Sequence, residues 1–252
     1  MKTINLIATS TSLVKATLVC LFCFVIFFTS PGLHAQTRNN PQMEALLDYA
    51  SDVYGTSDVL VNGWKYFPEH YNANGNPYFM DVEWIEGKVT IQGQTFDKVH
   101  LLYNIVDDEL ILRQHLKKGS LVFVVLNKDL IESFQMPGHQ FVHAKTLKTA
   151  PDQNDFYEMV HDGDFQFLIR YDKSFVNQYT AQSPHGSFSE QRSVNYILND
   201  GKLTRLQNRK SLLRYFDPYK KEIRTFLRKN GIKYRKATVA QLQNLMQYCD
   251  QL

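Results

Sequence analysis

The sequence has few of the features that mark several large protein classes. Only 3 of its 252 residues are cysteines, which excludes a scaffold held together by disulfides. The 28 basic and 25 acidic residues nearly balance at a formal charge of +3, whereas nucleic-acid-binding domains concentrate lysine and arginine. At 44% hydrophobic and 21% charged residues, the chain can bury a core. We therefore predict one folded domain without a nucleic-acid partner.

Short motifs of catalytic and cofactor sites are also missing. The chain contains no G-x-x-x-x-G-K phosphate loop, no G-x-G-x-x-G dinucleotide loop and no G-x-S-x-G nucleophile turn. The Asp- and Asn-rich segments 72–76 and 152–155 do not keep the spacing of a calcium-binding EF-hand. We predict no cofactor, no metal site and no catalytic residue, and the balance favours a protein that is not an enzyme. A site assembled from dispersed residues stays open.

The first 35 residues differ from the rest of the chain. Lys2 and Lys15 are the only charged residues there, and the segment 16–28 is almost entirely apolar. A basic start, a short apolar segment and a small residue before the break are typical of a secretory signal peptide, which predicts cleavage between Ala35 and Gln36. The apolar run is shorter than the roughly 20 residues that span a bilayer. An uncleaved membrane anchor is the alternative.

Export sets the predicted organisation of the chain. We expect a signal peptide over 1–35, a β-rich domain over 36–208, and a helical segment over 209–252 packed on the same domain. The protein is then exported to the periplasm or outside the cell. Cys249 is the remaining cysteine of the mature chain, and we interpret it as a buried residue of a helix.

Between residues 78 and 206 the hydrophobic pattern has a period of two. Val99, Leu101 and Tyr103 share one face, and the all-apolar segment 121–126 is typical of a central, fully covered strand. Turn dipeptides such as Asp162-Gly163 and Asp200-Gly201 separate the runs, which predicts hairpins of 156–161 with 165–171 and of 193–198 with 202–206. The pattern predicts a mainly β (α+β) fold, an antiparallel meander forming a curled sheet, half-barrel or barrel.

Helical signals lie at the two ends of the mature chain. The spacing predicts an N-terminal helix over 43–54. Asp217-Pro218 begins one C-terminal helix, which Asn230-Gly231 ends, and Thr238 with Gln241 forms the capping box of a second. We expect these two helices to cover the sheet, because each carries an apolar stripe.

Several segments together resemble a known group of sequences. They are Val61-Asn62-Gly63, Asn76-Pro77-Tyr78-Phe79, the stretch from Gly87 to Phe96, Gly138-His139-Gln140-Phe141, the Leu212, Leu213 and Phe216 motif, and the closing Lys/Arg-rich helix pair. This pattern resembles an uncharacterised family of exported bacterial proteins with no assigned activity. The resemblance implies export and a β-rich domain with a helical end.

Two sets of residues suggest chemistry at first sight. His139 and His143 are four apart, but on a strand this spacing separates them by about 13 Å, too far to share a zinc ion with ligands at about 2 Å. Asp107 and Asp108 suggest a glycosidase pair, but they lie at a predicted turn, where Asp is expected. Neither set is predicted to be a site.

The charge distribution is uneven. Between Arg205 and Lys236 the chain carries many basic residues and only two acidic ones, Asp217 and Glu222. A solvated helix face is the simpler interpretation of this tail, and contact with an anionic lipid, a cell-wall polymer or an acidic partner is the functional one. Membrane contact is expected only through the signal segment or weakly through this tail.

These observations leave three hypotheses. The first is an exported cell-envelope protein that binds an unknown envelope protein or lipid, or has a structural role, without catalysis. The second is a carrier of a lipid or other apolar ligand in a cavity of the curled sheet. The third is an envelope hydrolase with a dispersed site. Aromatic residues such as Trp64, Tyr66 and Phe67 could line a sugar or hydrophobic ligand site.

Overall fold

A computed structural model describes residue 60 and residues 62–81, 83–115, 121–147 and 154–252. These residues belong to one compact unit, Asp48–Leu252. The predicted signal peptide, its cleavage position at Ala35 and Gln36, and the helix predicted over 43–54 lie outside the described residues.

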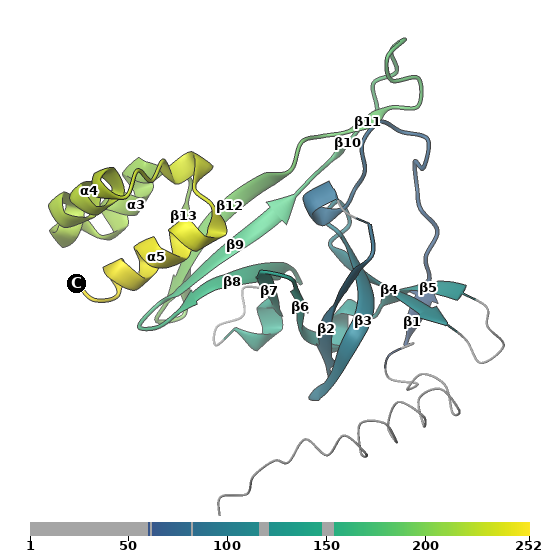
Figure 1. Cartoon of the computed structure of the whole chain (residues 1–252), viewed down its shortest axis with the longest axis horizontal. Coiled ribbons are helices and arrows are strands. Elements are labelled where there is room, and N and C mark those ends of the chain that lie inside the picture. The colour runs from purple at the N-terminus through teal and green to yellow at the C-terminus, as the bar shows by residue number, and fades with distance from the viewer. Residues whose placement is uncertain (1–59, 61, 82, 116–120, 148–153) are drawn as a thin grey trace, which may run out of the picture. The chain divides into compact units, whose positions relative to one another are not determined.

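The described unit is mainly β, as predicted, and its main element is an antiparallel sheet of eleven strands (Figure 1). The strand order is β1-β5-β4-β3-β2-β6-β7-β8-β9-β12-β13. The strands are β1 (Gly63–Lys65), β2 (Ile85–Ile91), β3 (Gln94–Asn104), β4 (Glu109–His115), β5 (Leu121–Leu126), β6 (Ile131–Met136), β7 (His139–His143), β8 (Phe156–Asp162), β9 (Gln166–Asp172), β12 (Arg192–Asn199) and β13 (Lys202–Leu206). A separate two-stranded sheet pairs β10 (Phe175–Val176) with β11 (Ser187–Phe188).

Helices follow the last strand. The α-helices are α3 (Arg209–Tyr215), α4 (Lys220–Lys229) and α5 (Val239–Cys249). Single 3-10 turns are η1 (Phe79–Asp81), η2 (Lys128–Leu130), η3 (Ala144–Thr146), η4 (Asp217–Tyr219) and η5 (Tyr234–Lys236).

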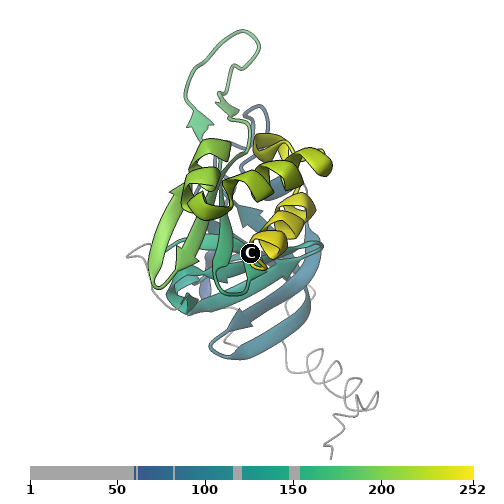
Figure 2. The same ribbon diagram turned by 90° about the vertical axis from the view of Figure 1, so that its left-hand side faces the viewer.

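The sheet is open, so the predicted curl and closure into a half-barrel or barrel are wrong. Its order ends at β1 on one side and at β13 on the other, and these two strands do not pair. The helices α3, α4 and α5 pack on the apolar side chains of the last strands, β8, β9, β12 and β13. Figure 2 shows α3, α4 and α5 beside these strands.

Two hydrophobic clusters form most of the core. In the first, strand residues such as Phe167 and Ile197 pack with helix residues such as Ile223 and Leu245, and all four are fully buried. The second cluster lies on β2 to β7, with further residues from the segments around them. Tyr171 of β9 packs against both clusters. The helical end is thus joined to the last strands by a common core.

The segment 121–126 forms a strand, but its predicted central and fully covered position is wrong. β5 lies next to the edge of the sheet, because its outer neighbour β1 has only three residues. Leu121 is 45% exposed, and the three following residues are half-buried. An apolar run alone did not distinguish a central strand from a strand next to the edge.

Local turn and cap signals were more reliable. Both predicted hairpins form, as β8 with β9 and as β12 with β13. The capping box is confirmed: the Gln241 amide donates to Thr238 Oγ1 at 3.2 Å, and the Thr238 amide donates to Gln241 Oε1 at 3.1 Å. At the end of α4, Gly231 has a φ of 63°, and the Ile232 amide donates to the Leu227 carbonyl at 2.9 Å. This left-handed C-cap is the one that Asn-Gly predicts.

The helical end contains three helices rather than the predicted two. The additional helix, α3, begins after Asn208, whose side chain accepts from the Ser211 amide in a second capping box. Asp217 and Pro218 form the 3-10 turn η4, and α4 begins directly after it at Lys220. The α-helix therefore begins one turn later than Asp217-Pro218 predicts.

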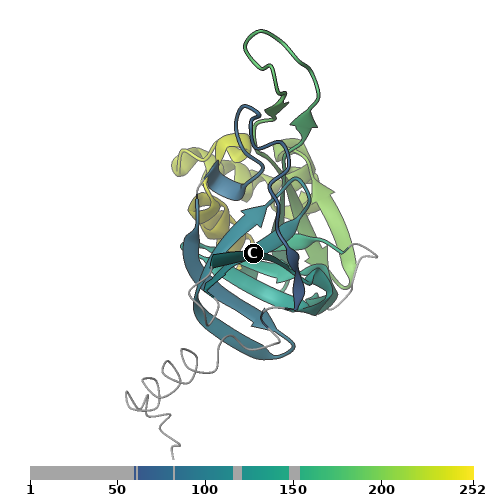
Figure 3. The same cartoon turned by 90° about the vertical axis from the view of Figure 1, so that its right-hand side faces the viewer.

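A long excursion of the chain carries β10 and β11 away from the large sheet (Figure 3). The His70 ring stacks on the Phe175 ring with centroids 3.6 Å apart, and Asn74 forms a bridge with Ser187. The segment around His70 is thereby attached to β10 and β11. At the base, the ammonium group of buried Lys173 donates to the Asn76 and Tyr78 carbonyls, each at 3.0 Å.

Candidate functional site

A hollow with a volume of about 390 Å³ lies where β1, the β3–β4 turn and the β10–β11 excursion meet. Most of its lining residues are aromatic or acidic. They are Trp64, Tyr66, Phe67, Glu69, His70, Pro77, Asn104, Val106, Asp107, Glu109, Val125, Phe175 and Phe188. We call it the aromatic–acidic hollow.

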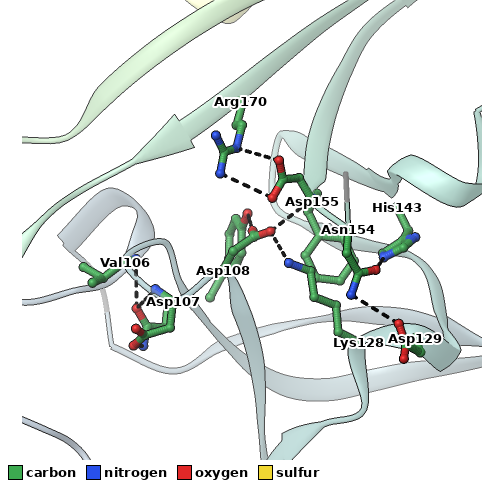
Figure 4. Close-up of polar contacts among 12 residues, drawn as sticks. Val106, Asp107, Asp108, Lys128, Asp129, His143, Asn154, Asp155 and Arg170 are labelled. Atoms are coloured by element: carbon green, nitrogen blue, oxygen red, sulfur yellow. Dashed lines mark hydrogen bonds and ion pairs between the residues drawn. The ribbon is translucent and has the colours of Figure 1, made fainter. Parts of the chain in front are cut away.

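The β3–β4 turn places the acidic side of this hollow. Buried Asn104 accepts from the amides of Val106 and Asp107 at 3.0 and 3.3 Å, and its side-chain nitrogen donates to Asp107 Oδ2 at 2.7 Å (Figure 4). An Asn that bonds its own turn in this way fixes the backbone locally. The Asp107 carboxylate is exposed, and the turn holds it at the hollow.

Asp108, the next residue, has different partners. Its carboxylate accepts from the Tyr103 hydroxyl at 2.5 Å and from the Phe156 amide at 3.2 Å, and it forms an ion pair with Lys128 (Figure 4). Asp108 is therefore a structural residue that ties the turn to β8. The prediction that Asp107 and Asp108 occupy a turn is confirmed. Asp107 lines the hollow, whereas Asp108 bonds to residues of the fold.

The acidic side chains of the hollow lack a cationic neighbour in its lining. Glu69, Asp107 and Glu109 contribute three carboxylates, and no lysine or arginine is among the lining residues. Burial and the neighbouring Asp107 charge raise the pKa of Glu109, although Lys128 acts in the opposite direction. The ionised form of Glu109 is thus disfavoured by repulsion and by loss of water. A positive charge in the hollow would remove part of this cost.

Aromatic faces form the other side. Trp64 is 54% exposed and Phe67 is 68% exposed, while the Tyr66 hydroxyl lies 2.9 Å from that of Tyr78. The Lys65 ammonium lies 4.8 Å from the centre of the Phe67 ring, within the range of a cation–π contact. One ring of this wall therefore already attracts a cation of the chain itself.

His139 and His143 both lie on β7, as the strand prediction requires, and they have separate partners. His143 is fully buried; its Nδ1 accepts from the Lys145 amide at 3.1 Å, and its Nε2 bonds Asn154 Oδ1 at 2.7 Å. Burial lowers the pKa of this imidazole. Asn154 also donates to exposed Asp129 at 3.2 Å (Figure 4). This network is structural.

His139 belongs to a second buried network. Its Nδ1 lies 2.6 Å from Glu158 Oε1, and the Tyr171 hydroxyl donates to Glu158 Oε2 at 2.5 Å. A carboxylate that orients an imidazole is one part of a catalytic triad. In the described part of the chain, however, no serine, threonine or cysteine side chain bonds to His139, and His139 does not line the hollow. Sequence reasoning did not single out Glu158, which is 1% exposed.

Three further observations concern metal ligands, helix length and Cys249 in the described residues. Among the described residues no three His, Cys, Asp or Glu side chains come together in a way that would hold a metal ion. The helices in this part of the chain are too short or too polar to cross a membrane. Cys249 is buried on α5, as predicted, and burial raises the pKa of its thiol to about 12.

Sequence reasoning identified some lining residues of the aromatic–acidic hollow, but it did not single out Glu69 or Glu109 and did not show which segments meet there. Trp64, Tyr66 and Phe67 were candidates for a ligand wall, and Asp107 was assigned to a turn. The sequence does not show that β1 pairs with β5 and so lies near the β3–β4 turn. Comparisons with known proteins found no matching family model, no matching curated protein and no matching solved structure.

Proposed function

We propose that this chain is an exported, non-enzymatic binding protein whose ligand is an organic cation held in the aromatic–acidic hollow. The observation that carries the proposal is the presence of three carboxylates, unaccompanied by any lining lysine or arginine, beside exposed aromatic faces. Aromatic faces attract cations such as protonated amines and quaternary ammonium groups, and the carboxylates supply the long-range attraction.

The chemistry favours an organic cation over a metal ion or a neutral sugar. The described carboxylates do not converge as metal ligands do. A sugar would use the aromatic faces, but it would leave the repulsion between Glu109 and Asp107 unrelieved. A cation uses both walls of the hollow, because it is attracted by the carboxylates and by the rings.

Export rests on the N-terminal sequence, and the partner is expected in the cell envelope. N-terminal sequencing of the protein isolated from its envelope tests this part: Gln36 is expected as the first residue, and a retained Met1 would replace export by a membrane anchor. The apolar-ligand carrier is not proposed, because it depended on a curled sheet and the sheet formed by the described residues is open. The hydrolase is not proposed either, because His139 lacks a bonded nucleophile within the described residues.

Choline and its neutral isostere 3,3-dimethylbutan-1-ol provide a matched pair of probes for isothermal titration calorimetry. Choline should bind and the isostere should bind at least about tenfold more weakly, a difference of about 1.4 kcal/mol. Equal binding of both would contradict the role of charge, and absence of binding by choline would contradict the proposed ligand class.

Two substitutions of lining residues test whether choline binds in the aromatic–acidic hollow. Trp64→Ala should weaken choline binding about 2- to 30-fold, which corresponds to loss of a cation–π contact of about 0.5–2 kcal/mol. Glu109→Gln should weaken it by about tenfold through loss of one carboxylate charge. The matched control is Glu86→Gln on β2, where the exposed side chain lies outside the hollow. An equal loss in the control would mean that net charge, and not this hollow, determines binding.

A further inference from the structure

A second hollow, of about 610 Å³, lies on the helical end of the chain, at α3 and α4. Its lining consists of Arg209, Lys210, Leu213, Arg214, Lys220 and Arg224. Five of these six residues are cations, and no acidic residue lines the hollow. We call it the basic hollow.

Most of these charges are unpaired. Lys220 forms an ion pair with Asp217. In the described part of the chain, the other four cations, Arg209, Lys210, Arg214 and Arg224, make no ion pair. Four uncompensated positive charges therefore surround one space.

Three of these cations lie at the start of a helix, where positive charge is unfavourable. Arg209 and Lys210 begin α3, and Lys220 begins α4, whereas a helix is stabilised by negative charge at its start. Arg214 is the exception, because it lies in the last turn of α3. The helix dipole, which was the simplest interpretation of the basic tail, thus does not explain Arg209, Lys210 and Lys220.

Like charges also repeat at the spacing that brings them together. Lys210 and Arg214 are four apart on α3, and Lys220 and Arg224 are four apart on α4. The two cations of each pair lie on one face of their helix, and their repulsion destabilises it. Both pairs line the same hollow. A solvated helix face does not require basic residues of two helices to line one hollow, whereas an anion-binding site does.

We propose that the basic hollow binds a phosphate-bearing anion. Three of its cations are arginines, whose planar guanidinium groups bind phosphate oxygens through two parallel hydrogen bonds. Leu213, which is 6% exposed, gives the hollow an apolar contact surface. The phosphate group can belong to a lipid headgroup or to a soluble molecule. This site has the opposite sign to the aromatic–acidic hollow and does not depend on the function proposed for it.

The experiment compares two double variants that remove the same net charge. Arg214→Gln with Arg224→Gln removes two arginines from the hollow. Arg228→Gln with Arg235→Gln removes two exposed arginines of α4 and η5 that do not line it. Thermal unfolding followed by circular dichroism verifies that both variants are folded. All four changes are at exposed positions, where substitutions usually change stability little.

Two probes distinguish the sources of phosphate. Vesicles of phosphatidylcholine with 30% phosphatidylglycerol, against pure phosphatidylcholine, test a lipid headgroup by co-sedimentation, and inositol hexakisphosphate tests a soluble ligand by calorimetry. We expect the wild-type protein to bind at least one probe, the hollow variant to lose at least about tenfold in affinity, and the control to lose less than about threefold. Binding should weaken as salt rises.

Other outcomes overturn the proposal. If both variants lose affinity equally, the charge of the whole tail attracts anions and the hollow is not a site. If the wild-type protein binds neither probe but binds a polyglutamate peptide, the partner is an acidic protein segment. If it binds none of the three, the basic residues form a solvated face only.

Discussion

Single side chains of this protein illustrate how surroundings change the role of one residue type. Asp107 and Asp108 are neighbours in one turn, yet one carboxylate is exposed at the hollow and the other accepts hydrogen bonds beneath it. The two histidines of β7 also differ. His139 lies against a carboxylate and His143 against an amide and a backbone N–H. The chemical role of each of these side chains therefore depends on the partners that the fold places beside it.

His143 should make stability depend on pH. Burial lowers its pKa, so in weakly acidic solution the unfolded chain takes up a proton that the folded chain does not. Stability contributed by the neutral ring is complete above the unfolded pKa of about 6.5. It falls as the pH drops below that value, by at most about 1.4 kcal/mol per pH unit.

Urea unfolding at pH 7.5 and pH 5.0 checks this prediction. His143→Gln should be less stable than wild type at pH 7.5 by about 1–3 kcal/mol, because buried groups lose their partners. Its stability should also decline less between the two pH values. His185→Gln, at an exposed position, is the control and should keep the wild-type decline. The same decline in both variants would assign the pH dependence to other groups.

At the scale of elements, the helix ends are the best-specified parts of the structure. The left-handed conformation of Gly231 allows the amide of Ile232 to bond back to Leu227, and both of these apolar residues belong to the core beneath α4. Asn is the other residue that tolerates this conformation. The cap thus combines a backbone requirement with a hydrophobic contact.

Gly231→Ala should cost about 1–2 kcal/mol, the price of a left-handed conformation for a residue with Cβ, and Gly231→Asn should cost less. An added Cβ meets no atom within 4 Å at this position, so the difference isolates backbone conformation from packing. Thermal or urea unfolding measures it. If the two variants are equally destabilised, the φ of Gly231 is not what the position requires.

Elements also mark the limit of prediction from sequence. Hairpins and caps were correct because their signals, such as Asp200-Gly201, lie within a few residues of the contacts they specify. The pairing of β2 with β6 and of β1 with β5 joins distant segments, and no local signal specifies it. The open sheet, the near-edge position of β5 and the aromatic–acidic hollow all depend on such pairings. The sheet was therefore predicted to curl, β5 was placed at its centre, and the hollow was not predicted.

At the scale of the whole described unit, two large hydrophobic clusters and two smaller ones pack along one sheet. Helices cover the core at β9 and β12, while the core on β2 to β7 consists largely of strand residues. Tyr171 packs against both. The helical end therefore stabilises the later strands directly and the earlier strands only through the continuity of the sheet.

Leu245→Ala tests this division. The side chain is fully buried on α5, so its truncation should cost about 2–5 kcal/mol. Hydrogen exchange followed by mass spectrometry should show faster exchange in β8, β9 and β12 and little change in β3 and β4. Equal acceleration in all strands would show that the sheet opens as a single unit.

The open order of the sheet has one more consequence. A sheet that does not close ends in strands whose outer backbone groups can pair with another chain, which is the usual start of aggregation. Here the described edges are short: β1 has three residues and includes Lys65, and β13 has five and includes Lys202 and Arg205. Short, positively charged edge strands discourage further strand addition. The two described edges of the sheet thus disfavour polymerisation by strand pairing between molecules.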